Sequence, residues 1–248
     1  MPPHRLFPVP GAAVATTIHG SGPPIALVHG GTGTAAFDWE FVIEPLAQSH
    51  TVVAMDMRAH GYSPIADGRI GTSRCGLDVA TVMHRLGFPS FVAMGFSMGA
   101  NACVQLAAVQ PWRVTHLVTV GASVESFPER VDEILTGPWP RELRELPHPA
   151  SDKGGEHWKW LRAQLAQDWV DNVAFDPEFL RRIEAPVLAI HGADDVITDP
   201  AQARKLVAGV RNGRAEFVAN AGHAVQRDQP EEFLRLVGEF LGSLRSPM

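Results

Sequence analysis

Short apolar runs alternate with helix-length segments along the 248-residue chain. The runs are continuously apolar, which is typical of strands buried on both faces of a sheet. The predicted strands are residues 12–18, 25–29, 51–55, 91–96, 114–120, 187–191 and 215–219. The predicted helices are residues 38–48, 73–86, 98–110, 200–210 and 230–244. This alternation predicts an α/β fold, a mostly parallel central sheet with helices on both faces.

Helix-end signals support these assignments. Asp38 and Asp199 stand where N-cap residues are expected, and Pro200 would take the first helical position. Gly87 follows the helix that ends at Leu86, as a C-terminal glycine should.

One region interrupts the alternation. Residues 124–182 contain a Pro-rich stretch at 136–155 and a helical phrase, EHWKWLRAQLAQDWV, at 156–170. We therefore predict a core domain made of residues 1–123 and 183–248, with residues 124–182 forming a small helical cap inserted between two strands of the core.

Charge and cysteine content narrow the possible partners. The 27 acidic and 21 basic residues give a formal net charge of −6, which disfavours nucleic acid or an anionic membrane. No run of about 18 apolar residues and no secretory leader pattern is found. The two cysteines, Cys75 and Cys103, have neither metal-ligand nor redox spacing. We expect a cytoplasmic monomer or homodimer without a membrane span.

The motif GFSMG, residues 95–99, follows a predicted strand and precedes a predicted helix. A sharp turn between a strand and a helix strains the central residue and needs small neighbours, which Gly95 and Gly99 supply. Such a turn would expose the Ser97 hydroxyl at the end of the sheet. The N-terminus of the next helix would direct backbone N–H groups toward the same point. The pattern predicts a nucleophilic serine.

Together with four other motifs, this turn resembles the α/β-hydrolase superfamily, in particular its compact serine hydrolases with a single cap. The resemblance covers essentially the whole chain. It rests on HGG at 29–31, DMRAHGYS at 56–63, GFSMG at 95–99, HGADD at 191–195 and AGH at 221–223. One departure is Ala59, where many members carry glycine, in a turn without a catalytic role.

The resemblance implies a Ser-Asp-His triad. Its acid follows a late strand as G-x-x-D, which selects Asp195, and leaves Asp194 to hydrogen-bond the turn around it. Glu125 is the alternative acid, because some members of the superfamily take their acid from the corresponding earlier strand. The general base would be His223, between the last strand and the last helix.

The resemblance also implies two backbone donors for the oxyanion, Gly31 and Met98, although a shift by one residue would place Thr32 in the role of Gly31. We expect structural roles for other histidines. His29 and His191 would be held beneath their loops. His60 would belong to a turn.

The predicted cap is rich in tryptophan. Trp139 and Trp160 are candidate substrate-binding residues. A stripe at helical spacing predicts packing of the cap onto the core. It consists of Trp158, Leu161, Leu165 and Trp169.

These features predict hydrolysis of a small or medium ester or lactone, without a metal or another cofactor. Serine at the turn argues against dehalogenase and epoxide hydrolase chemistry, for which the superfamily uses aspartate. Carbon–carbon bond hydrolases, enol-lactonases, cofactor-free perhydrolases and a lyase use the same triad and remain alternatives. A small-molecule receptor on this fold is disfavoured by the complete triad.

Overall fold

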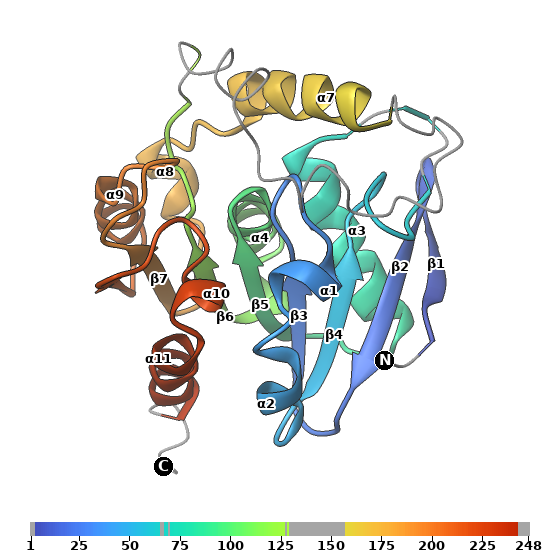
Figure 1. Ribbon diagram of the computed structural model, residues 1–248, viewed down its shortest axis with the longest axis horizontal. Helices are drawn as coiled ribbons and strands as arrows, with labels where there is room; N and C mark the ends of the chain where they lie inside the picture. Colours follow the sequence, from blue (N-terminus) through green and yellow to red (C-terminus); the bar gives the residue numbers. More distant parts are fainter. Residues whose placement is uncertain (1–2, 65–66, 69, 127, 129–156, 243–248) are drawn as a thin grey trace.

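An eight-stranded sheet forms the centre of the protein, as seen in a computed structural model that describes residues 3–64, 67–68, 70–126, 128 and 157–242 (Figure 1). The strands lie in the order β1-β2-β4-β3-β5-β6-β7-β8. Only the β1–β2 and β2–β4 pairs are antiparallel. The predicted α/β class is therefore confirmed. The strands are β1 (Arg5–Val9), β2 (Ala12–His19), β3 (Pro24–Val28), β4 (Thr51–Asp56), β5 (Phe91–Phe96), β6 (Val114–Val120), β7 (Val187–Gly192) and β8 (Gly213–Val218).

Strand β1 was not predicted. Only Phe7 and Val9 of its five side chains are buried, and Pro8 interrupts its sequence. Proline cannot donate to a sheet ladder and is tolerated at an edge. Since β1 is the first strand in the sheet order, it occupies such an edge.

The predicted helices are found in the structure with one exception, and three short helices, at residues 111–113, 177–180 and 225–228, were not predicted. The helices are α1 (Ala35–Asp38), α2 (Ile43–Ala47), α3 (Thr72–Arg85), α4 (Met98–Val109), the 3-10 helix η1 (Pro111–Arg113), α7 (His157–Asn172), α8 (Pro177–Leu180), α9 (Ala201–Gly209), α10 (Val225–Asp228) and α11 (Pro230–Gly242). As predicted, Gly87 has the positive φ, 85°, that is typical of a glycine just after the C-terminus of a helix. Helix α9 starts one residue later than predicted, and the Asp199 carboxylate accepts from the Ala201 N–H.

The prediction of one continuous helix from residue 38 to residue 48 is wrong. Thr34, not Asp38, is the N-cap, and its hydroxyl accepts from the Phe37 N–H. A new short helix then begins at Ile43, which leaves Pro45 in its first turn. Within one long helix the missing N–H of Pro45 would have broken a hydrogen bond, whereas a first turn does not need it.

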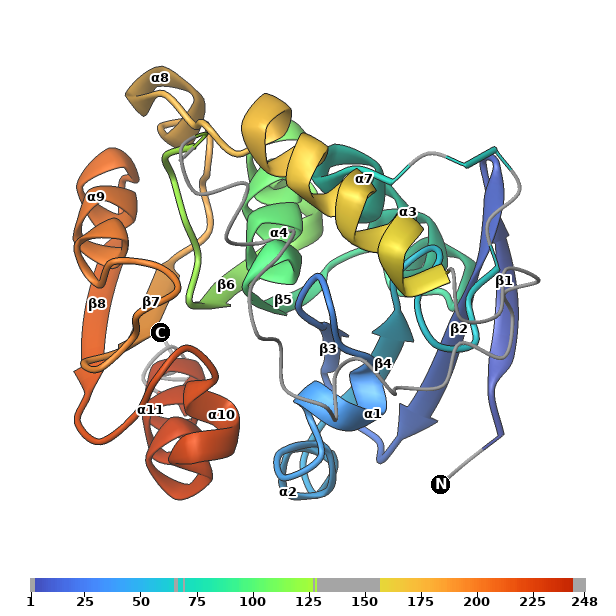
Figure 2. The same cartoon turned by 45° about the horizontal axis from the view of Figure 1, so that its top comes forward.

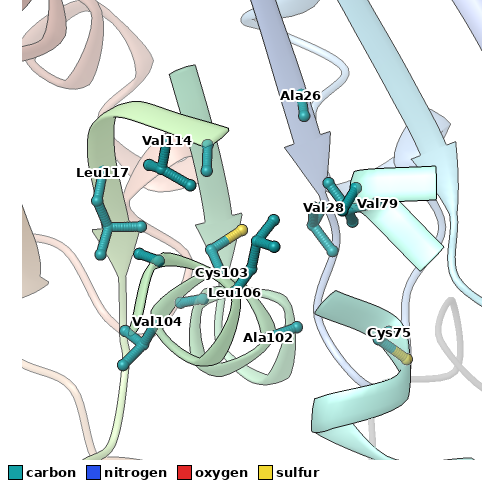
Figure 3. Packing of buried hydrophobic residues seen from close by; sticks show 14 of the residues in the cluster. Ala26, Val28, Cys75, Val79, Ala102, Cys103, Val104, Leu106, Val114 and Leu117 are labelled. Carbon is teal, nitrogen blue, oxygen red and sulfur yellow. The ribbon is translucent and has the colours of Figure 1, made fainter. Parts of the chain in front are cut away.

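The two faces of the sheet carry separate hydrophobic clusters. Alternate residues of β3 point to opposite sides, so that Ala26 and Val28 belong to one cluster while Ile25 and Leu27 belong to the other. Figure 3 shows Ala26 and Val28 on the side of the sheet where α3 and α4 pack. Helices α1, α2 and α11 cover the second face.

The strand order places the predicted site at a reversal of chain direction across the sheet. Strands β3 and β5 are neighbours, and the connection that leaves β3 leads to β4 on one side, whereas the connection that leaves β5 leads to β6 on the other. Open α/β sheets bind ligands in the crevice at the carboxyl ends of strands at such a point. The loops after β3 and β5 contain HGG and GFSMG, respectively.

Helix α7 lies across this end of the sheet (Figures 1 and 2). His157 Nε2 is 2.8 Å from the carbonyl oxygen of Ala59. Near the other end of α7, the buried Asp168 carboxylate accepts from the backbone N–H and the hydroxyl of Thr72. It thereby caps α3, whose own N-cap residue, Gly71, has no side chain to do so. Two α7 residues, Leu161 and Leu165, also pack against Ala59.

The boundaries of the predicted cap fall partly outside the described residues and remain a prediction. Within the described part of the chain, no helix has the length and apolarity needed to cross a membrane.

The contact between α3 and α4 depends on Gly76. A Cβ atom at this position would lie 2.6 Å from the carbonyl oxygen of Ala102. We expect Gly76→Ala to lower the free energy of unfolding by about 1–3 kcal/mol, because the two helices must move apart. Urea unfolding of the variant measures the change.

Gly238→Ala is the matched control, because Gly238 lies inside α11 with no atom within 4 Å of the new methyl. It should leave stability unchanged or raise it by about 0.5–1 kcal/mol through helix propensity. Equal effects of the two substitutions would contradict the close contact.

Candidate active site

Ser97 occupies the strained turn that the sequence predicted. Its backbone has φ 52° and ψ −120°, between β5 and α4. A Cβ atom at Gly95 would lie 2.3 Å from the Gly99 carbonyl oxygen, and one at Gly99 would lie 2.3 Å from the His29 carbonyl oxygen. Both glycines are therefore required for the close approach of the chain. The Ser97 N–H donates to the carbonyl of Val120 on β6, 2.8 Å away.

Asp195 follows β7 and is the most heavily hydrogen-bonded side chain of the site. Its Oδ1 accepts from the backbone N–H groups of Ile197 at 2.8 Å and Thr198 at 3.0 Å. Its Oδ2 accepts from the Thr198 hydroxyl at 2.9 Å, and lies 3.0 Å from His191 Nε2 and 2.8 Å from His223 Nδ1. Burial raises the pKa of the Asp195 carboxyl, but the hydrogen bonds from His191 and His223 outweigh it and hold the pKa below its ordinary value.

The two alternative acids lie elsewhere. Asp194 is exposed, and its N–H donates to the Ala221 carbonyl at 3.0 Å, as expected of a turn residue. Glu125 Oε2 is bound by the side chains of Gln202 at 2.8 Å and Lys205 at 2.5 Å. The only candidate acid that the structure places against His223 is therefore Asp195.

His223 lies between β8 and α10. Its ring packs against the Phe96 ring, with 5.0 Å between centroids. A Cβ atom at Gly121 would lie 2.8 Å from His223 Cε1, so glycine is needed there, and Gly121 also has a φ of +59°. Gly121 directly follows Val120, the residue that Ser97 bonds. The structure thus brings Ser97 and His223 to the end of one strand, β6.

The loop after β3 approaches the same point. A Cβ atom at Gly31 would lie 3.3 Å from Met98 Sδ and 3.4 Å from Leu165 Cδ1. Within the described residues, no hydrogen bond is made by the backbone N–H of Gly31 or of Thr32. The structure therefore leaves both groups as candidate oxyanion donors, and the choice between Gly31 and Thr32 stays open.

Three residues near the site make contacts that the sequence did not indicate. Asp38, predicted as a cap, is buried and accepts from the Gly30 N–H at 2.8 Å. His60 Nε2 is 2.7 Å from the Gly31 carbonyl oxygen, and His191 contacts the carboxylate of Asp195. These pairs are distant in sequence or depend on loop geometry, so no local pattern predicts them.

The predicted substrate-binding residues differ in what can be said of them. Trp160 is half-buried and packs against Ala59, Leu161 and Leu165 of the α7 contact, with its ring 5.5 Å from that of His157. Trp139 lies outside the described residues. Within the stripe on α7, Leu161 and Leu165 are buried and Trp169 is half-buried, while the side chain of Trp158 is not described.

Both cysteines are buried free thiols. In the part of the chain that the structure describes, no group of three or more His, Cys, Asp or Glu side chains could hold a metal ion.

Comparison with known proteins identifies the family. The family described as the alpha/beta hydrolase fold matches residues 23–150. The 2-hydroxymuconate semialdehyde hydrolase of Pseudomonas sp. (strain CF600) is 29% identical over 260 residues, covering 93% of this chain and 91% of that protein. This chain belongs to the alpha/beta hydrolase fold family, as its motifs suggested.

Solved structures share the fold. The meta-cleavage product hydrolase from Pseudomonas fluorescens IP01 superposes with a TM-score of 0.85 at 20% identity, covering 97% of this chain and 98% of that one. The enol-lactonase from Burkholderia xenovorans LB400 has a TM-score of 0.78 at 21% identity, covering 96% of this chain and 100% of that one.

Strain at Ser97 can be measured directly. Glycine adopts positive φ at little cost, whereas other residues in sparsely populated backbone regions cost about 1–3 kcal/mol. We expect Ser97→Gly to be more stable to urea than Ser97→Ala by about 1 kcal/mol. The alanine variant is the control, because it also removes the hydroxyl but keeps Cβ. Equal stability of the two variants would show that the turn is unstrained.

Proposed function

We propose that this protein is a serine hydrolase that cleaves a small or medium carboxylic ester or lactone through an acyl-enzyme. The observation that carries the proposal is the contact between the buried Asp195 carboxylate and His223 Nδ1, 2.8 Å apart. A carboxylate can only accept, so Nδ1 must carry a proton, and in the neutral imidazole the lone pair is then on Nε2. His223 is therefore prepared to act as a base.

The reaction follows from this arrangement. The Ser97 hydroxyl attacks the substrate carbonyl as its proton passes to His223 Nε2, and the imidazolium is stabilised by Asp195. The oxyanion of the tetrahedral intermediate is held by the N–H of Met98 and that of Gly31 or Thr32. Collapse breaks the bond to the leaving group, which departs with the proton from His223.

Water completes the cycle. The oxygen of a water molecule attacks the acyl carbon while His223 takes a proton from that water. The second tetrahedral intermediate then collapses, the Ser97 oxygen leaves with that proton, and the carboxylic acid is released.

The surroundings of the site favour an uncharged, apolar substrate. The atoms nearest to a Cβ atom placed on Gly31 belong to the side chains of Met98 and Leu165, and the Phe96 ring packs against His223. Apolar walls with a few fixed polar groups are typical of small-molecule sites. We propose that Trp160, which packs against the same α7 cluster, contributes to this wall.

A second candidate function is hydrolysis of a carbon–carbon bond in a vinylogous diketone. It is favoured by the similarity to the 2-hydroxymuconate semialdehyde hydrolase, which extends over 93% of this chain. The Ser-Asp-His set serves either reaction, so turnover has to separate them.

A substrate panel tests the proposal. It contains short-chain p-nitrophenyl esters, a lactone and a vinylogous diketone. We expect turnover of the esters or the lactone, and we expect Ser97→Ala to lower kcat on the order of 10⁴-fold or more while leaving the circular dichroism spectrum unchanged. Ser49→Ala is the control. Ser49 is exposed and lies in the loop before β4, at the end of the sheet opposite to the candidate site.

Each result decides between the candidates. Cleavage of the diketone with no cleavage of esters or lactones would replace the proposed function by the second one. Activity that survives in Ser97→Ala would contradict both.

A further inference from the structure

The side chain of Asp38 is buried inside the loop that follows β3. Its Oδ2 lies 2.8 Å from the backbone nitrogen of Gly30. A Cβ atom at Gly33 would lie 2.2 Å from the same oxygen, and one at Gly30 would lie 3.4 Å from it. The loop closes around the carboxyl group through a hydrogen bond from the Gly33 N–H to the Gly30 carbonyl, 3.1 Å. Glycine at position 33 thus leaves the space that the carboxyl fills.

His29 fixes the next peptide group of the loop. Its Nε2 accepts from the Met57 N–H at 2.8 Å, so its Nδ1 carries the proton and donates to the Gly30 carbonyl at 2.7 Å. The C=O and N–H of a trans peptide point in opposite directions. With the Gly30 carbonyl held by His29, the N–H of Gly31 faces away from His29. Asp38 holds the preceding peptide, and both together set the orientation of the Gly31 N–H.

Asp38 is also linked to the segment that carries His223. Arg227 of α10 donates a hydrogen bond to the carbonyl of Phe37, the neighbour of Asp38, and its guanidinium lies 4.0 Å from the centre of the Phe37 ring. Since α10 begins two residues after His223, α1 is braced against the part of the chain that presents the predicted base.

Resting on the proposed acyl-transfer function, we propose that Asp38 is a positioning residue of the oxyanion hole. It binds the Gly30 N–H so that the next peptide presents the Gly31 N–H to the developing oxyanion. Among the described residues, Asp38 makes no hydrogen bond to Ser97 or His223, and we assign it no part in proton transfer.

The electrostatics of Asp38 are consistent with this role. Burial raises the pKa of its carboxyl to about 7, although the Gly30 N–H and Arg227 act in the opposite direction. The oxygen that accepts from Gly30 is present in the neutral and in the charged form. An asparagine, which keeps an oxygen acceptor of the same length, should therefore preserve the position of the loop.

Variants at Asp38 separate positioning from folding. We expect Asp38→Ala to lower kcat on p-nitrophenyl esters by about 10- to 100-fold, somewhat less than the loss of an oxyanion donor, with KM changed less than about 3-fold. Asp38→Asn should keep kcat within about 3-fold of the wild type. Asp176→Ala, which removes the cap of α8 and its bond to the Phe179 N–H, is the control and should leave kcat unchanged.

A trifluoromethyl ketone provides a readout that a general loss of stability would not move. It adds to the serine and places an oxyanion in the hole, so its Ki should rise in Asp38→Ala by the same factor as kcat/KM falls. Binding of the product carboxylic acid, which has no tetrahedral oxyanion, should change less than about 3-fold.

Gly33→Ala supplies a second variant, whose kcat and trifluoromethyl ketone Ki test the proposal without Asp38→Ala should that variant fail to fold. The new methyl displaces the carboxyl group, so Gly33→Ala should lower kcat when it is the only substitution. In the Asp38→Ala background, where the space is empty, adding Gly33→Ala should change kcat little further. Additive losses would overturn the proposal, as would an Asp38→Ala enzyme with wild-type kcat and Ki. A wild-type protein without any Ser97-dependent turnover would overturn the proposed function and the role of Asp38 with it.

Discussion

The buried carboxylate of Asp195 is the constraint on which the geometry of the site depends. An ionised group removed from water is costly unless hydrogen-bond donors surround it. Two backbone N–H groups and the hydroxyl of the loop after β7 meet this need, together with His191 and His223. Because β7 and β8 are neighbouring parallel strands, their loops leave the same edge of the sheet. The carboxylate thus holds the two loops and the imidazoles of His191 and His223 in a fixed relation.

Close backbone contacts fix the positions of the loops after β3, β5 and β6, which form the rest of the site. Gly99 lets α4 approach the carbonyl of His29, which ties the loop after β5 to the loop after β3. Gly121 makes room for the ring of His223 beside the residue that Ser97 bonds. The strand order brings these loops together. Helix α7 lies across this end of the sheet and is held there by contacts of His157 with Ala59 and of Asp168 with Thr72 (Figure 2).

Local sequence patterns predicted the features that depend on local physics. The α/β class and the strained turn at Ser97 follow from apolar runs and glycine spacing, and both are confirmed. Strand β1 was missed because only two of its side chains are buried and Pro8 interrupts the pattern that is typical of a strand. Asp38 was taken for a helix cap, since its contact with Gly30 across a folded loop leaves no local pattern. The limits of the cap and the catalytic roles remain predictions.

The rate at which a fluorophosphonate labels Ser97 tests the central claim, that Asp195 orients His223 for attack by this serine. Asp195→Asn removes the charge and keeps the shape, while Asp194→Asn and Glu125→Gln make the same change at the two alternative acids. Mass spectrometry of the modified peptide identifies the labelled residue. We predict that Asp195→Asn slows labelling by about 100-fold or more and that the other two variants label at the wild-type rate. Labelling at another residue, or a larger loss in Asp194→Asn or Glu125→Gln, would contradict the account.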